Sequence, residues 1–175
     1  RLLEQKISLL EDSIRISSNR TEVKSILTEM KKIGIEKLPY SYSALKQFID
    51  AKTMNIHYNK HYKTYVDKLN DALSKRGSNE NDLKKIIKNI SKYNKTIRNN
   101  AGGAFNHALF WNMLSPTPKK LTGELYDKII KEFGSVREFK SKFEEVAKAR
   151  FGSGWEWLII TDNNRLKVIS TGNQD

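Results

Sequence analysis

The three histidines of this chain are its strongest candidates for chemistry, because all three lie among aromatic residues in segments with helical spacing. His57, His61 and Tyr65 follow one another at four-residue intervals, so an α-helix would carry them on one face. His107 lies in a second segment of the same character. Imidazole is the commonest protein ligand for metal ions, so the pattern predicts a buried metal site between two helices.

The pair His57 and His61 has a second interpretation when it is considered alone. Histidines four residues apart on a helix can chelate one metal ion together, as they do in zinc proteases. The glutamate that follows the first histidine in that motif is replaced here by Tyr58. Without further context, the pair is more typical of a helix with ordinary, partly buried histidines.

His107 is predicted to be buried, because Phe110 and Trp111 follow it at helical spacing and share its face. It could be a core histidine that is satisfied by one hydrogen bond. The adjacent Gly102 and Gly103 favour a functional site, because each glycine inside a helix costs about 1 kcal/mol relative to alanine. Such a cost is expected where another backbone or side chain must approach closely.

Composition restricts the possible functions. The chain has 175 residues, of which 38% are hydrophobic and 30% are charged, so it is expected to form a globular body. It has no cysteine, which excludes disulfides, thiolate metal sites and cysteine nucleophiles. No apolar run approaches the roughly 18 residues that a membrane span requires. The acidic residues Glu4, Glu11 and Asp12 argue against a secretory signal, and the compartment stays open between cytoplasm and mitochondrion.

The net charge of +12 suits either nucleic acid or a small anionic substrate as partner. A third interpretation is a lysine- and asparagine-rich composition whose lysines are simply solvated. The lysines are scattered along the sequence and do not form one compact run: Lys84, Lys85, Lys88, Lys92, Lys95, Lys119 and Lys120.

The apolar periodicity divides the chain into an extension and a helical domain. Residues 1–36 are predicted to be a helical extension of two short amphipathic helices, broken at 17–19, that packs on the body or on a partner. Residues 37–115 should form a helical domain in which long helices at about 50–73 and 94–114 make an antiparallel hairpin. Shorter helical segments are predicted at 43–49 and 82–91.

Residues 116–175 are predicted to form a second, incomplete α/β domain, so the fold class is α+β. Two capped helices are followed by two strand-like runs around the turn at 162–164. A two-stranded ribbon is marginally stable alone, so we expect a third strand from outside this chain. The predicted elements are helices 122–133 and 135–150 and strands 157–161 and 166–170.

Four segments in this order resemble the iron/manganese superoxide dismutase family. They are HYNKHYKTY from His57, NNAGGAFNHALFWN around His107, ARFGSGWEWL at 149–158 and STGNQD at 170–175. The resemblance extends from about Leu38 to Asp175 and leaves residues 1–36 outside. It implies a helical hairpin followed by an α/β domain with a three-stranded antiparallel sheet.

The resemblance also implies one iron or manganese ion with four protein ligands. His57 and His107 match the two ligands that the hairpin supplies. The other two, an aspartate and a histidine, belong to an Asp-x-Trp-Glu-His motif after the third strand, and this chain stops before that motif. We therefore expect residues 1–175 alone to bind metal weakly and to have little activity.

Three further residues match positions that act near the metal without binding it. His61 matches a residue near the substrate channel and the dimer contact, and Tyr65 matches a gateway tyrosine. Gln174 together with Gly103 resembles the manganese type, although Ala104 stands where many manganese members have histidine. The resemblance favours manganese over iron, and we expect the Gln174 amide to occupy the space beside Gly103. Trp111, Trp155 and Trp157 resemble the aromatic wall of the site.

The function implied by the resemblance is conversion of superoxide to dioxygen and hydrogen peroxide by redox cycling of one Mn or Fe ion. Superoxide would be the substrate, a homodimer or tetramer is expected, and no membrane partner is implied. The alternative is a non-enzymatic basic helical protein that binds nucleic acid through residues 84–95. That alternative requires a defined basic stripe and leaves Gly102 and Gly103 unexplained, so nucleic acid is the less favoured partner.

Overall fold

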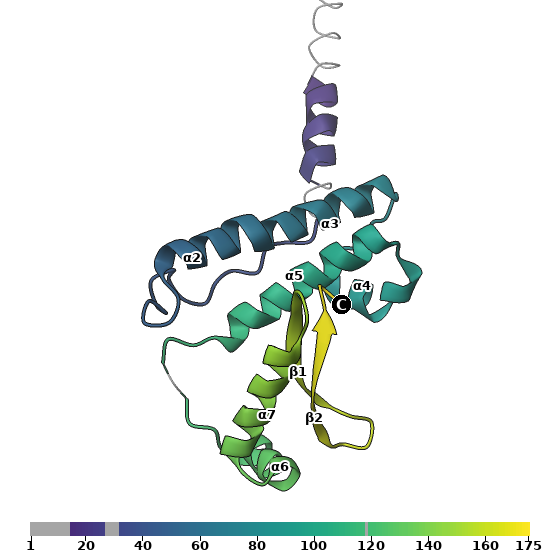
Figure 1. Ribbon diagram of the computed structural model, residues 1–175. Coiled ribbons are helices and arrows are strands. Elements are labelled where there is room, and N and C mark those ends of the chain that lie inside the picture. The colour runs from purple at the N-terminus through teal and green to yellow at the C-terminus, as the bar shows by residue number, and fades with distance from the viewer. Residues whose placement is uncertain (1–14, 27–31, 118) are drawn as a thin grey trace, which may run out of the picture.

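The computed structural model describes residues 15–26, 32–117 and 119–175, so the helix predicted within residues 1–14 lies outside the described residues. The α+β class is confirmed: a helical hairpin is followed by a smaller lobe of two helices and a two-stranded sheet (Figure 1). None of the helices in the described ranges combines the length and the apolar composition that a membrane crossing needs.

Residues 15–26 form one uninterrupted helix, so the break predicted at 17–19 is wrong. The Thr21 hydroxyl donates to the Ser17 carbonyl within this helix, so this polar side chain bonds its own helix without ending it. The helix points away from the body (Figure 1), and its apolar residues Ile16, Val23 and Ile26 are all exposed. The described part of the extension therefore does not pack on the body.

The first arm of the hairpin is a continuous helical stretch of α2 (Ala51–Ile56), η1 (His57–Tyr62) and α3 (Lys63–Lys75), which confirms the helix predicted at about 50–73. Asp50 begins it as predicted, because its carboxylate accepts a hydrogen bond of 2.9 Å from the Thr53 N–H.

The segment η1 is a π-helix, which the spacing of the apolar residues did not predict. Its winding is visible where it meets α3, because the Lys63 N–H donates to the Tyr58 carbonyl, five residues earlier. Each residue turns the chain through a smaller angle here than in an α-helix, so the side chains of η1 are redistributed around the axis.

Residues 42–48 form consecutive turns, so the helix predicted at 43–49 is wrong. Backbone N–H groups in this segment mostly bond three residues back, as in the Phe48 N–H to Leu45 carbonyl bond of 2.8 Å. Leu45 is buried, whereas Phe48 is 86% exposed. One buried apolar side chain gives too little packing to support so short a helix.

The second arm is α5 (Lys95–Met113), which runs antiparallel to α3 (Figure 1) and matches the helix predicted at 94–114. A short helix α4 (Leu83–Lys88) and a 3-10 turn η2 (Ile90–Lys92) connect the arms where a helical segment was predicted at 82–91, and η2 ends one residue later. The Asn94 side chain accepts a 2.9 Å hydrogen bond from the Ile97 N–H and thereby begins α5. The core between the arms consists of fully buried side chains: Leu69, Ile86, Ile97, Ala101 and Trp111.

The C-terminal lobe contains α6 (Gly123–Phe133), α7 (Val136–Ala149), β1 (Gly154–Ile160) and β2 (Leu166–Gly172). The strands are antiparallel, with Trp157 opposite Ile169. β1 begins three residues earlier than predicted, and β2 ends two residues later. In the part of the chain that the structure describes, the sheet has these two strands. An ion pair of 2.8 Å between Arg165 and Glu132 joins the strand hairpin to α6.

The chain that leads into the hairpin is fixed to α3 by one side chain. Asn70 accepts a 2.8 Å hydrogen bond from the Ile33 N–H and donates a 3.0 Å bond to the Ile33 carbonyl. Ile33 is only 6% exposed and belongs to the core. Tyr58 and Tyr62 then bond the backbone of Glu36, through its carbonyl and its N–H respectively. The segment is therefore part of the hairpin core, although it has no helix or strand of its own.

The two lobes meet where α5 carries adjacent glycines. A methyl group at Gly102 would overlap the Gln174 carbonyl oxygen, and one at Gly103 would overlap the Tyr65 ring. The expectation that Gly103 makes room for the Gln174 amide is therefore wrong, because the Tyr65 ring fills that space. Gly102 is the residue that leaves room for Gln174, and the part of Gln174 that approaches it is the backbone carbonyl. Arg98 strengthens the contact by an ion pair of 2.7 Å with Asp175.

Replacing Asn70 by alanine should lower the free energy of unfolding by about 1–3 kcal/mol, because the Ile33 N–H and carbonyl would both lose their partner. Urea denaturation measures the change. Asn79→Ala, at an exposed loop position, is the matched control and should be close to neutral. Equal stability of the two variants would show that the Asn70 contact contributes nothing to folding.

Replacing Gly102 by alanine should lower the stability by about 1–3 kcal/mol, because the added methyl meets backbone that cannot move without separating the lobes. Gly34→Ala is the control, since nothing lies within 4 Å of its new methyl group. That change should be neutral or stabilise by up to about 1 kcal/mol. Thermal unfolding of both variants tests this, and an unaffected Gly102→Ala protein would rule out the close contact with Gln174.

Candidate metal centre

His57 and His107 converge between the two arms of the hairpin. His57 is the first residue of η1, and His107 lies on the facing side of α5. Their Nε2 atoms are 3.1 Å apart, and the two rings are perpendicular with centroids 5.0 Å apart. The predicted convergence is confirmed. Two imidazole nitrogens about 2.1 Å from a shared ion on neighbouring coordination positions would be roughly 3.0–3.4 Å apart, so the spacing fits a metal.

The hydrogen bond of His107 to its own helix determines which nitrogen is free. His107 Nδ1 lies 2.7 Å from the Gly103 carbonyl oxygen. Because a carbonyl oxygen can only accept, Nδ1 must carry the proton. The lone pair of His107 is therefore on Nε2, which is the atom that faces His57. A backbone carbonyl that holds the far nitrogen of a histidine is the usual way to orient a metal ligand.

Burial keeps both imidazoles in the neutral form that binds metal. Desolvation, with smaller contributions from the nearby His107 and His61, lowers the pKa of His57 to about 4. Desolvation also lowers the pKa of His107, against a smaller opposing effect of its bond to the Gly103 carbonyl. Protons therefore do not compete for these nitrogens near neutral pH.

His61 stands apart from this pair. Its ring centroid is 6.0 Å from that of His57, and in the described residues no hydrogen bond joins it to either ring. The interpretation in which His57 and His61 chelate together is wrong, because His57 directs its Nε2 atom towards His107. Across residues 15–26, 32–117 and 119–175, no group of three or more histidine or carboxylate side chains is close enough to hold a metal. These ranges thus supply two converging nitrogens.

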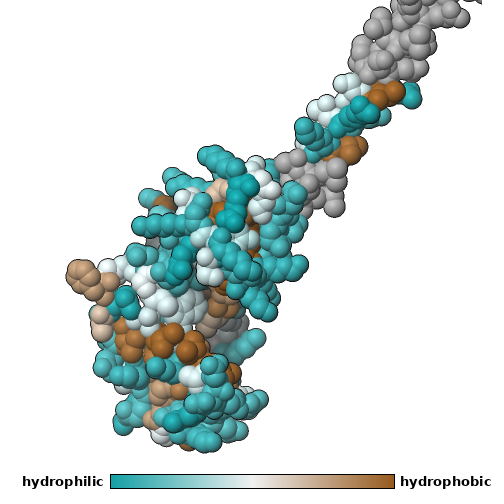
Figure 2. Space-filling model, turned by 90° about the vertical axis from the view of Figure 1, so that its right-hand side faces the viewer, coloured by the Kyte–Doolittle hydropathy of each residue, from teal (hydrophilic) through white to brown (hydrophobic). Residues whose placement is uncertain are grey.

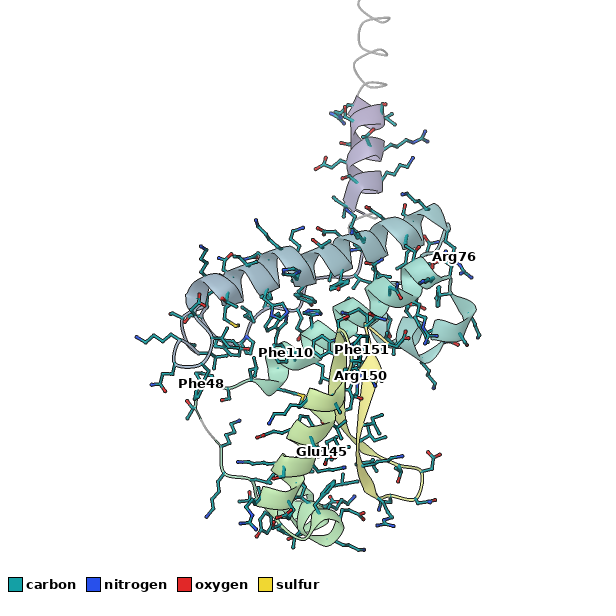
Figure 3. The ribbon with its side chains drawn as sticks, in the orientation of Figure 1. Phe48, Arg76, Phe110, Glu145, Arg150 and Phe151 are labelled. Carbon is teal, nitrogen blue, oxygen red and sulfur yellow. The ribbon has the colours of Figure 1, made fainter. Side chains whose placement is uncertain are left out.

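Aromatic rings enclose the histidine pair. The Trp111 centroid is 4.9 Å from His57, the Trp155 centroid is 5.0 Å from His107, and Tyr62 stacks on His107 at 6.1 Å. Phe110, labelled in Figure 3, has its ring 6.0 Å from His57 and 5.8 Å from Trp155. These rings remove water from around the imidazoles, which strengthens any electrostatic interaction there.

Trp157 lies one ring farther out than Trp155, at a centroid distance of 6.2 Å from it. Its indole N–H donates to the Thr171 hydroxyl at 2.9 Å, across the two strands. Trp111 and Trp155 are therefore the members of the predicted aromatic wall that contact the histidines, and Trp157 supports Trp155 from behind.

Gln174 links the sheet to the hairpin beside the histidines. Its Oε1 accepts a 3.1 Å hydrogen bond from the Trp155 indole, and its Nε2 lies 3.2 Å from the Tyr65 hydroxyl, to which it donates. The Tyr65 ring is in turn 5.3 Å from His107. Asn106, for which no role was predicted, donates to the Gln174 carbonyl at 3.4 Å. The structure thus brings Tyr65 and Gln174 together, as the resemblance implied.

The predicted site residues surround one cavity of about 550 Å³. Within the described ranges its lining contains no lysine or arginine. His61 lies at this cavity although it does not join the histidine pair. The predicted residues found in the lining are His57, His61, Tyr65, His107, Trp155 and Gln174.

Tyr62 contributes to the site but was missed in the sequence. It is 2% exposed and stacks on His107, and its hydroxyl accepts from the Glu36 N–H. In an α-helix, five residues after His57, it would point about 140° away from it. In the π-helix, five residues amount to little more than one turn, so both side chains reach the same space. The interleaved aromatic residues of this segment were the available signal.

Two family models match this chain. The α-hairpin domain of iron/manganese superoxide dismutases matches residues 32–115, and the C-terminal domain of the same family matches residues 121–175. A relative described as superoxide dismutase [Mn], from Acinetobacter baylyi, is 49% identical over 156 residues, which cover 86% of this chain. The match spans 66% of that relative's length.

The two matches follow one another along most of the chain, and their shared boundary falls between the hairpin and the C-terminal lobe. The order of the domains agrees with the converging histidines and with the Gln174 bridge between the lobes. The chain belongs to the iron/manganese superoxide dismutase family.

Proposed function

We propose that the protein is a superoxide dismutase in which His57 and His107 bind a single manganese or iron ion. The observation that carries this proposal is the pair of neutral imidazoles whose Nε2 atoms lie 3.1 Å apart. The donor set fits, because imidazole nitrogens suit both metals and because the lone pair of His107 is already directed into the space between the rings. Bound manganese or iron would supply the one-electron redox chemistry that converts superoxide to dioxygen and hydrogen peroxide.

The chain's own residues would control protons and solvent at this centre. Gln174 is held at both ends, by the Trp155 indole and the Tyr65 hydroxyl, so its amide has one orientation. Tyr65 can pass on or hold a proton through its hydroxyl, since it both donates and accepts. Tyr65, Gln174 and His61 are proposed as the residues that act on superoxide and its protons in the cavity of about 550 Å³.

Manganese is the proposed metal within the family. Two features support it: the combination in the sequence of a glutamine at 174 with a glycine at 103, which resembles the manganese type, and the similarity to a relative whose description specifies manganese. Hydrogen bonds to the surroundings of a metal tune its potential, so the orientation of Gln174 is the feature that would distinguish the metals.

The remaining protein ligands and the partner subunit are proposed from the family resemblance. An aspartate and a histidine would come from an Asp-x-Trp-Glu-His motif, which residues 1–175 do not contain. A homodimer is proposed with its contact near His61, and a tetramer is the next larger assembly. The helix at 15–26 would lie outside the catalytic lobes, since its apolar residues contact neither.

Alanine at either His57 or His107 should reduce the manganese bound by the complete protein at least about tenfold, because each would remove a direct ligand. His61→Ala is the matched control, since it changes the same residue type in the same cavity and should keep the metal. Metal analysis after exhaustive dialysis measures all three variants. If His61→Ala lost as much metal as His57→Ala, the assignment of the ligands would be overturned.

Replacing Gln174 by alanine should lower turnover by about 10–100-fold while metal content stays close to that of the wild type, because the Tyr65 hydroxyl would lose its donor. The potential of the bound metal should shift as well. Gln47→Ala, at an exposed position outside the cavity, is the control. Loss of the metal from the Gln174 variant would show instead that this side chain is a ligand.

A further inference from the structure

Positive charge is concentrated at the end of the hairpin where α3, α4 and η2 meet. Residues 76–95 carry six cationic side chains and only two carboxylates, those of Glu80 and Asp82. All six cations are exposed. We call this cluster the basic tip, and it consists of Arg76, Lys84, Lys85, Lys88, Lys92 and Lys95.

Among the described residues, no ion pair neutralises the charge of the basic tip. In the described residues, lysines elsewhere form ion pairs, such as Lys63 with Asp67 and Lys148 with Glu144, but no ion pair within 4 Å includes a residue of the tip. Asp82 accepts from the Lys84 and Lys85 N–H groups, and Glu80 accepts from the Asp82 N–H. Both carboxylates therefore serve the backbone at the start of α4.

The fold gathers half of the tip around one hollow. Arg76, Lys85 and Lys92 line a cavity of about 440 Å³, with Glu80 as the one carboxylate among its described lining residues. Arg76, labelled at the end of the hairpin in Figure 3, lies 4.8 Å over the Tyr93 ring and donates to the Lys92 carbonyl at 3.2 Å. Its guanidinium group is thus held in place without a counter-ion. The lysines that are scattered in the sequence form the defined basic surface that a polyanion requires.

The basic tip is too far from the metal centre to attract superoxide. His57 and Lys75 are separated by most of the helical stretch, which corresponds to roughly 25 Å. Screening in physiological salt reduces such a field over about 8–10 Å. The cavity at the histidines has no lysine or arginine in its described lining. Attraction of superoxide therefore does not account for the concentration of charge at the tip.

The tip itself presents no fully exposed large hydrophobic side chain; Ile87 and Ile90 are half-buried and line a separate hollow with the sheet residues Trp157, Ile159 and Ile169. The large hydrophobic side chains that are exposed in the described ranges all lie outside residues 76–95. The face that includes this end of the molecule is mainly hydrophilic, above a separate hydrophobic band (Figure 2). Membrane-surface binding uses buried apolar groups as well as charge, and protein interfaces have an apolar centre.

Phosphate in a nucleic acid backbone is the partner that requires only charge. Proteins that bind single strands stack bases on exposed aromatic rings. The Tyr93 ring is partly buried and already carries Arg76, so it offers no such platform. We propose that the basic tip binds the phosphate backbone of double-stranded nucleic acid without sequence preference, in addition to the function of the metal centre.

The test measures binding of the complete, metal-loaded protein to a fluorescent 20-base-pair duplex, about two helical turns, by anisotropy at several salt concentrations. The tip variant carries Lys84→Gln, Lys88→Gln and Lys92→Gln together. The control carries Lys140→Gln, Lys142→Gln and Lys148→Gln, which removes the same charge from exposed positions on α7. Thermal unfolding and dismutation should be unchanged in both, because neither set touches the metal centre.

The wild type and the control should bind the duplex with the same salt dependence. The tip variant should bind at least about tenfold more weakly near 0.1 M salt, with a slope of log K against log salt that is smaller by about 2–3. Equal loss in both variants would overturn the proposal, because binding would then follow net charge alone. Tighter binding to phosphatidylserine vesicles or to a single strand than to the duplex would also overturn it.

Discussion

The close approach of three chain segments at Gly102 and Gly103 is the constraint on which the site depends. Tyr65 from α3 occupies the space above one glycine, and the Gln174 backbone occupies the space above the other. The Gly103 carbonyl also fixes the proton of His107. Any side chain at Gly103 would separate the hairpin arms, and any side chain at Gly102 would separate the two lobes. The packing of the arms, the orientation of the His107 ring and the contact of Gln174 with the hairpin therefore all depend on these two glycines. The helix-weakening cost of two glycines is offset by these contacts.

The π-helical segment has a comparable effect on the other arm. It places His57 and Tyr62 on the same side of the helix, where one faces His107 through a nitrogen atom and the other stacks on its ring. The hydroxyl groups of Tyr58 and Tyr62, from the same segment, bond the Glu36 carbonyl and N–H respectively. One segment therefore positions a nitrogen donor, covers its partner and holds the chain that leads into the core.

Helix spacing and caps were sufficient to predict the two arms of the hairpin and the two strands, because these depend on local patterns. The convergence of His57 with His107 is not local, and it followed from the family resemblance of the four motifs. The π-helix, the turns at 42–48 and the unbroken helix at 15–26 were not predictable, because tertiary contacts or the absence of them decide such cases. The residue expected beside Gly103 was Gln174, and it lies beside Gly102 instead. The sequence does not show which of two adjacent helix positions faces a given neighbour. Residues 84–95 were recognisable in the sequence as a candidate basic surface, whereas the position of Arg76 beside Lys85 and Lys92 follows from the fold.

The tryptophans give the protein a built-in optical property. The chain has three, and all lie at the histidine pair or at the ring behind it. The Trp111 indole N–H is buried without a hydrogen-bond partner in the described residues, whereas that of Trp155 bonds Gln174 and that of Trp157 bonds Thr171. Their intrinsic fluorescence therefore reports on the junction of the two lobes and is insensitive to the outer faces of α6 and α7. Quenching by a paramagnetic ion would make the same emission a direct titration signal for occupancy.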